Sequence, residues 1–104
     1  MEKLKLKDHP YCKCYVLKEN NVINFISYTT TVIIAVKSTE NENEWHLVCT
    51  GTYSQTTQKQ ISWFLREYFP LLNYYNIKEI AGKEKIIVYN SNTEKFYIKN
   101  DIAK

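Results

Sequence analysis

The stretch that decides the fold is "GTYSQTTQKQISWFLREYFP", residues Gly51 to Pro70. Apolar side chains recur in it at the i, i+3, i+4 and i+7 spacing of a single helical face. They are Ile61, Phe64, Leu65 and Tyr68. The spacing predicts one amphipathic helix over about 57–69.

The two ends of this helix carry their own signals. Thr57 followed three residues later by Gln60 matches a capping box, so Thr57 is the predicted N-cap. Pro70 disfavours helical backbone angles at Phe69, and the helix should therefore end there.

The segments on both sides of the helix read as strands. "YCKCYVLK", "VINFIS", "TTTVIIAVK", "EWHLVCTGTY", "KEKIIVYN" and "EKFYIKN" are rich in β-branched and aromatic residues. They predict an α+β fold in one domain, 1–104: an antiparallel sheet of about five to six strands with the helix packed on one face. The continuous apolar run Val32–Val36 predicts a central strand covered on both faces. We expect the helix to pack against Val32, Ile34 and Val48.

One segment keeps two interpretations. "LLNYYNIKEIAG", which follows the helix, is either a loop or a loop with a short helical turn ending near Gly82.

Composition limits the class of protein. The chain has 104 residues, 44% apolar and 24% charged, and a net charge of +3. A dedicated nucleic-acid binder has a larger basic excess, and a mimic of DNA charge would be strongly acidic. No window approaches the ~20 apolar residues of a membrane span, and no signal peptide is recognisable. The odd cysteine count then predicts free thiols and a cytoplasmic protein.

Metal and catalytic chemistry are weakly supported. Cys12, Cys14 and Cys49, together with His9 and His46, lack the ligand spacing of zinc sites, so we expect thiols in the core, no metal and no cofactor. His46 and Cys49 lie three apart in a predicted strand and therefore face opposite sides. With no nucleophile and base that can meet, we expect a protein that is not an enzyme.

Binding residues are predicted at three places. The helix start offers Ser54, Thr56 and Lys59 to an anion such as a phosphate or carboxylate. Nine tyrosines exceed what a core of this size needs, and Tyr74 and Tyr75 should be exposed together as interface residues. The acidic tip of the predicted hairpin adds one more set: Glu40, Glu42 and Glu44.

"SYTTTVIIAV" followed by "YSQTTQKQISWFL" resembles small proteins encoded by bacteriophages and prophages. In these, a Ser-Tyr-x-Thr-x-Val strand precedes a Tyr-Ser-x-Thr-Thr-x-Lys helix start. The matching positions here are Ser27, Tyr28, Thr30, Val32, Tyr53, Ser54, Thr56, Thr57, Lys59 and Ile61. Members of this group often have His after the Lys, where this chain has Gln60. The resemblance covers under half the chain and implies a small accessory protein, without an activity to carry over.

These observations lead to three functional hypotheses. The first is a non-enzymatic binding protein that occupies a surface of a host protein; association with phage proteins extends it to a counter-defence inhibitor of the anti-CRISPR kind. The alternative is a nucleic-acid-binding accessory protein that uses Lys/Tyr-rich strands, namely the N-terminal segment and "KFYIK". The third hypothesis is a small-ion or ligand site at the helix start. In its most specialised form, such a site would belong to an enzyme.

Overall fold

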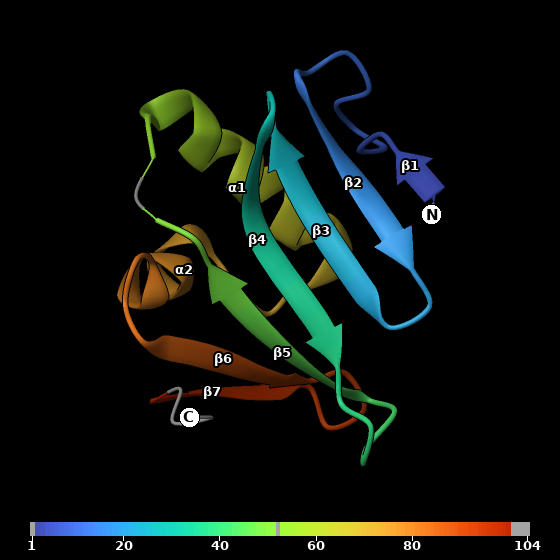
Figure 1. Ribbon diagram of the computed structural model, residues 1–104, viewed down its shortest axis with the longest axis vertical. Helices are drawn as coiled ribbons and strands as arrows, with labels where there is room; N and C mark the ends of the chain where they lie inside the picture. The colour runs from blue at the N-terminus through green and yellow to red at the C-terminus, as the bar shows by residue number, and fades with distance from the viewer. Residues whose placement is uncertain (1, 52, 101–104) are drawn as a thin grey trace.

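Figure 1 shows the computed structural model of the chain, which describes residues 2–51 and 53–100. Within these residues, seven antiparallel strands form one sheet, and their order in space is their order along the chain. The strands are β1 (Glu2–Leu4), β2 (Cys14–Glu19), β3 (Val22–Ser27), β4 (Thr30–Lys37), β5 (Glu44–Cys49), β6 (Lys85–Asn90) and β7 (Lys95–Asn100).

Between β5 and β6, the described part of the chain forms two helices, and both cover the same face of the sheet (Figure 1). They are α1 (Gln55–Tyr68) and α2 (Tyr74–Ile80). The predicted α+β class with a helix on one face is therefore confirmed. The predicted count is wrong, because the described residues form seven strands and two helices.

The second helix settles the open interpretation of "LLNYYNIKEIAG". The Asn73 side chain accepts a hydrogen bond from the Asn76 N–H, and the Asn76 side chain accepts one from the Asn73 N–H. This reciprocal pair is a capping box built from two asparagines. The helix ends at Ile80, and Gly82 has a φ of 66°, a left-handed angle that glycine adopts without a Cβ clash.

The start of α1 differs from the prediction. Ser54 is the N-cap, and its hydroxyl accepts from the Thr57 N–H at 3.4 Å. Thr57 lies in the first turn and is buried, so its prediction as N-cap is wrong. Its hydroxyl is 3.2 Å from Ser27 Oγ, which also donates to Gln60 Oε1 at 2.5 Å. Thr57 and Gln60 therefore join α1 to the end of β3. The predicted end near Pro70 is confirmed, since Phe69 is the C-cap.

The helical stripe packs into the core as predicted. Ile61, Phe64 and Leu65 are at most 1% exposed, and the rings of Phe64 and Phe25 stack with centroids 4.6 Å apart. Tyr68 is half-buried and stacks on Phe64.

The strand residues under the helices are in part different from those predicted. Ile33, Ala35 and Leu47 are fully buried in the core, as is Val32. Ile34 and Val48 pair with each other across β4 and β5 on the opposite face, so their prediction as helix contacts is wrong. An uninterrupted apolar run has no alternation, and only alternation indicates which residues face a helix.

The second face of the sheet is also more open than predicted. β4 is the central strand, as expected, but no described element covers its outer face. Val36 is 42% exposed there. Among the described residues, no helix is long and apolar enough to cross a membrane.

Candidate binding groove between the two helices

A hollow of about 590 Å³ lies between α1 and α2. Its lining consists of Gln55, Gln58, Lys59, Ser62, Tyr74, Tyr75 and Lys78. Three of the residues predicted from the sequence, Lys59, Tyr74 and Tyr75, therefore meet in one place. Two lysines and no carboxylate line the groove among the described residues, so its charge favours an anionic group.

Helix geometry explains why these side chains converge. Gln55, Lys59 and Ser62 are spaced i, i+4 and i+7, which places them along one side of α1, apart from the stripe that enters the core. Tyr74 and Lys78 have the same i, i+4 relation on α2. The groove lies where this polar side of α1 meets the side of α2 that carries Tyr74 and Lys78.

Two of the polar groups in the groove already have partners within the protein. Ser62 Oγ donates to the Gln58 carbonyl at 3.2 Å, and Gln58 Nε2 donates to the Tyr53 carbonyl at 2.9 Å. Within residues 2–51 and 53–100, the ammonium groups of Lys59 and Lys78 make no hydrogen bond or ion pair. These two cations are therefore the groups that remain available to a ligand.

The two tyrosines differ in exposure. Tyr75 is 75% exposed, whereas Tyr74 is half-buried against the core. Burial raises the pKa of the Tyr74 phenol, and the nearby Cys49 raises it further. The prediction that both would be exposed together is wrong for Tyr74. Tyr74 lies three residues before Ile77, on the side of α2 that faces the sheet.

The remaining residues at the helix start lie outside the groove lining. Ser54 caps α1, so its hydroxyl has a structural role. Thr56 is exposed in the first turn. Four residues of the groove lining were missed by the sequence reasoning: Gln55, Gln58, Ser62 and Lys78. The i, i+4 spacing of Tyr74 and Lys78 could have predicted that Lys78 lies beside Tyr74. This prediction needs the segment to be helical, which the sequence left open.

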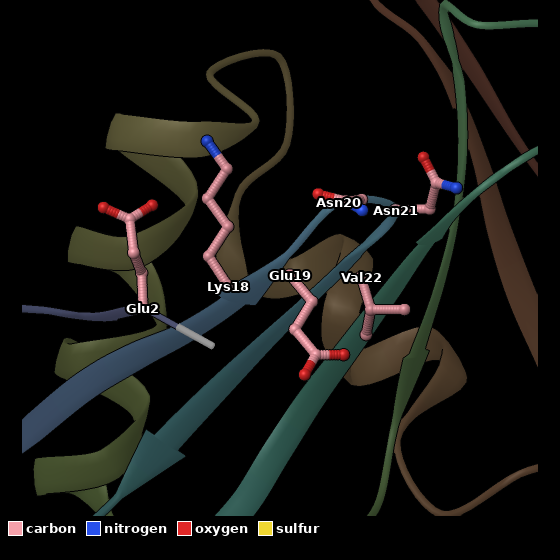
Figure 2. A pocket seen from close by; sticks show the side chains of 6 residues that line it. All are labelled: Glu2, Lys18, Glu19, Asn20, Asn21 and Val22. Atoms are coloured by element: carbon pink, nitrogen blue, oxygen red, sulfur yellow. The ribbon is translucent and has the colours of Figure 1, made fainter.

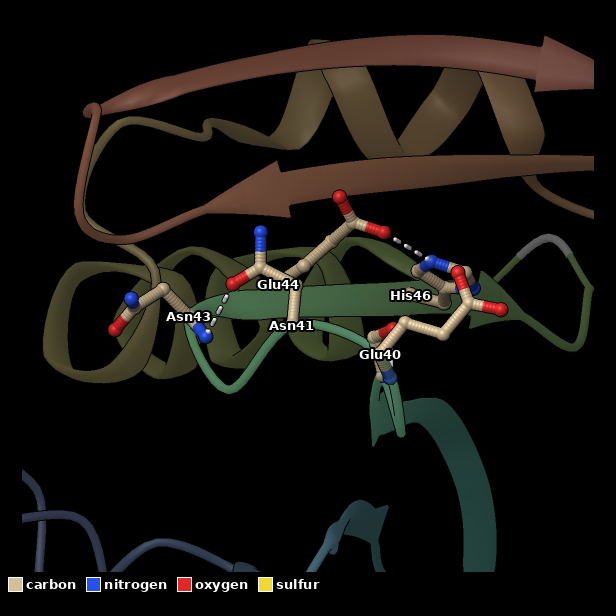
Figure 3. Close-up of polar contacts among 6 residues, drawn as sticks. Glu40, Asn41, Asn43, Glu44 and His46 are labelled. Carbon is tan, nitrogen blue, oxygen red and sulfur yellow. Dashed lines mark hydrogen bonds and ion pairs between the residues drawn. The ribbon is translucent and has the colours of Figure 1, made fainter.

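The acidic tip lies apart from the groove. Figure 3 shows the turn between β4 and β5, where the Asn43 N–H donates to Asn41 Oδ1 at 3.0 Å. Glu40 and Glu42 are exposed, and Glu44 Oε1 is 3.0 Å from His46 Nε2. Figure 1 places this turn and the start of α1 at opposite ends of the molecule. The structure does not bring the three glutamates into the same site as Lys59.

A larger hollow of about 870 Å³ lies at the turn between β2 and β3. In Figure 2, the side chains of Glu2 and Lys18 point to one side of the strands, and those of Glu19 and Val22 point to the other. Side chains that diverge in this way do not converge on a ligand, so size alone does not make this hollow a site.

The cysteines differ from the prediction of three free thiols. Cys12 and Cys14 are paired in a disulfide, with Cα atoms 5.4 Å apart. Cys49 is a free, buried thiol, and burial raises its pKa. Pairing of Cys12 with Cys14 is a contact between near neighbours in the chain, and cysteine counting does not test for it.

The possible metal ligands do not gather. The His9 ring stacks on Trp63 of α1 with centroids 3.6 Å apart, whereas His46 lies on β5 and pairs with Glu44. No group of three His, Cys, Asp or Glu side chains that could hold a metal ion occurs in the described part of the chain.

Comparisons of the chain with protein-family models, with curated proteins and with solved structures give no match.

Proposed function

We propose that the protein is a non-enzymatic binding protein that holds an acidic segment of a partner protein in the groove between α1 and α2. The observation that carries this proposal is the convergence of Lys59, Lys78 and Tyr75 on one groove, whose described lining residues include no carboxylate. Two ammonium groups without a partner in the described residues favour a carboxylate between them.

The tyrosines suit a protein partner. Tyrosine is enriched among the residues that dominate binding energy at protein interfaces, because it offers a large ring at low conformational cost. Tyr75 is exposed and Tyr74 is anchored against the core, so the groove combines one adaptable ring with one fixed ring. His46 and Cys49 are three residues apart on β5, so their side chains point to opposite faces of the sheet, and Cys49 is in the core. A catalytic His–Cys pair needs both side chains on one face, so this arrangement supports a role outside catalysis.

The class of partner and the compartment follow from the resemblance to phage proteins. The Ser-Tyr-x-Thr-x-Val and Tyr-Ser-x-Thr-Thr-x-Lys segments resemble those of phage and prophage proteins. We therefore propose a host protein in the host cytoplasm as the partner, with a defence nuclease as the first candidate and inhibition as the result. In a reducing cytoplasm the Cys12–Cys14 bond would be open to reduction.

The alternative of nucleic-acid binding through one joint Lys/Tyr face meets a geometric objection. The Lys-rich N-terminal segment contains β1, and "KFYIK" lies in β7. These two strands are at opposite edges of the seven-stranded sheet. The two segments therefore do not form one continuous surface.

The test uses the purified protein with purified host defence nucleases. Size-exclusion chromatography would detect a complex, and a DNA-cleavage assay would detect inhibition. The variant Lys59→Ala/Lys78→Ala removes both groove cations. Its matched control, Lys95→Ala/Lys99→Ala, removes two exposed lysines from β7. The proposal expects complex formation with the wild type and the control, and its loss with the groove variant.

Two results count against the proposal. If no nuclease forms a complex and none changes activity, the counter-defence form is wrong. If a complex forms equally well with Lys59→Ala/Lys78→Ala, the partner binds elsewhere and the groove assignment is wrong.

A further inference from the structure

A second pocket, of about 290 Å³, lies where the start of β2 meets the turn between β3 and β4. Its lining consists of Lys3, Lys5, Lys13, Tyr15, Tyr28 and Thr29. None of these residues lines the groove between the helices. The turn and the start of β2 lie side by side at the top of Figure 1, as the pairing of Cys14 with Ser27 requires.

The pocket opens on the face of the sheet that the helices leave uncovered. Tyr15 lies between Cys14 and Val16, which are both fully buried in the core under the helices. Because successive side chains of a strand point to opposite faces, Tyr15 points away from the helices. A ligand here would not compete for space with one in the groove between α1 and α2.

The charge of the pocket is of one sign. Three lysines line it, and no carboxylate does so among the described residues. The ammonium group of Lys3 lies 4.5 Å from the centre of the Tyr15 ring, which holds that cation over the aromatic face. Three neighbouring cations repel each other, and a bound polyanion relieves that repulsion.

Tyr28 supplies an independent observation. It is the first residue of a two-residue loop between the paired Ser27 and Thr30, and its φ is 58°. This left-handed angle suits glycine and is unfavourable for a bulky side chain. The ring is 53% exposed, so packing in the core does not offset the strain. Strained residues of this kind cluster at binding sites, and this one presents an aromatic ring beside three lysines.

We propose that this Lys/Tyr pocket binds single-stranded nucleic acid, with the Tyr28 ring stacked on one base and the lysines in contact with phosphates. Aromatic rings beside basic side chains form the usual platform for unpaired bases, which have exposed faces for stacking. A base-paired duplex hides those faces, so the exposed Tyr28 ring favours an unpaired strand over a duplex. Of the two Lys/Tyr-rich segments, the N-terminal one therefore has a nucleic-acid ligand in this proposal, without any contribution from "KFYIK".

The direct test measures binding of a fluorescent oligothymidine to the purified protein by anisotropy across a series of salt concentrations. Three phosphate contacts, at about 0.7 each, predict a slope of about −2 for log affinity against log salt concentration. The variant Lys5→Ala/Lys13→Ala should reduce the magnitude of that slope by about 1.4. Lys95→Ala/Lys99→Ala, which removes the same charge from the opposite edge of the sheet, should leave the slope unchanged.

Substitutions of Tyr28 separate stacking from folding. Tyr28→Gly should weaken binding about 5- to 150-fold, the range that loss of one stacked base gives. Its unfolding midpoint should stay level or rise, because glycine adopts the left-handed angle freely. Tyr28→Phe keeps the ring and the backbone strain, and it should bind like the wild type.

Four outcomes would overturn the proposal: no binding of oligothymidine at low salt, duplex DNA bound as tightly as the single strand, full affinity in Tyr28→Gly, or an equal loss in the Lys95→Ala/Lys99→Ala control. A free mononucleotide that binds as tightly as the oligomer would also overturn it, since the phosphates of a strand would then contribute nothing.

Discussion

The two sides of α1 are made of different kinds of residue and are determined in different ways. The inward side carries Ile61, Phe64 and Leu65, which are at most 1% exposed and fix the helix on the sheet. The outward side carries Gln55 and Lys59, whose surroundings depend on where α2 lies. Periodicity identifies the apolar residues of the first side. Residues of the second side line a groove only because α2 faces them.

The strongest way to test this contrast is to remove the centre of the inward side. Phe64→Ala should lower the free energy of unfolding by about 3–5 kcal/mol, because the ring stacks on Phe25 and contacts Phe69, so its loss leaves a cavity. Urea unfolding followed by circular dichroism would measure this. As the control, Tyr75→Ala on the exposed side of the groove should stay within about 0.5 kcal/mol of the wild type. Equal losses in the two variants would contradict the contrast.

A smaller effect is expected where the inward side makes polar contacts. Ser27→Ala should lower the free energy of unfolding by about 1–3 kcal/mol, because the buried Thr57 hydroxyl and Gln60 carbonyl oxygen both lose a partner. The same urea titration applies. Thr57→Ser, which keeps the hydroxyl, is the matched control and should lose less. A Ser27→Ala protein as stable as the wild type would show that these contacts are not maintained in solution.

The cap of α1 should have a smaller effect again. Ser54→Ala should lower the free energy of unfolding by about 0.5–2 kcal/mol, since the Thr57 N–H loses its acceptor at the helix start. Ser54→Asp keeps an acceptor there and adds a favourable charge, so it should be at least as stable as the wild type. Thermal unfolding of the three proteins gives the ranking. If Ser54→Ala has no effect, Ser54 is not the N-cap.

Local patterns predicted those parts of the fold that depend on neighbours in the chain. The stripe of α1 and its end before Pro70 follow from spacing and from proline sterics. The role of Thr57 was predicted wrongly, because Ser27 is 30 residues away and a capping pattern contains no information about such a partner. The face of β4 that meets the helices was also beyond reach, since Val32–Val36 has no polar residue to mark the outside.

In the candidate site, too, some residues could be predicted from local patterns and others depend on contacts between distant segments. Lys59, Tyr74 and Tyr75 were singled out for their chemistry, and the structure brings them together. Their partner Lys78 was missed, because α2 was one of two interpretations and its outward side was therefore undefined. The glutamates at the β4–β5 turn had the same kind of signal as Lys59, an exposed charge at the end of an element, yet they lie at the other end of the molecule. The sequence shows which residues have side chains suited to binding, but the fold determines which of these side chains lie close together.

The smallest expected effect on stability is also the sharpest test of the outward side of α1. Lys59→Ala/Lys78→Ala removes two exposed cations that line the same groove and have no partner among the described residues. Its free energy of unfolding should therefore stay within about 0.5 kcal/mol of the wild type, and the loss of like-charge repulsion favours a small gain at low salt. Urea titrations at low and high salt would measure both. A loss above about 1 kcal/mol would mean that these lysines hold α1 and α2 together, as a core contact does, and that the groove is part of the scaffold instead of a surface left free for a partner.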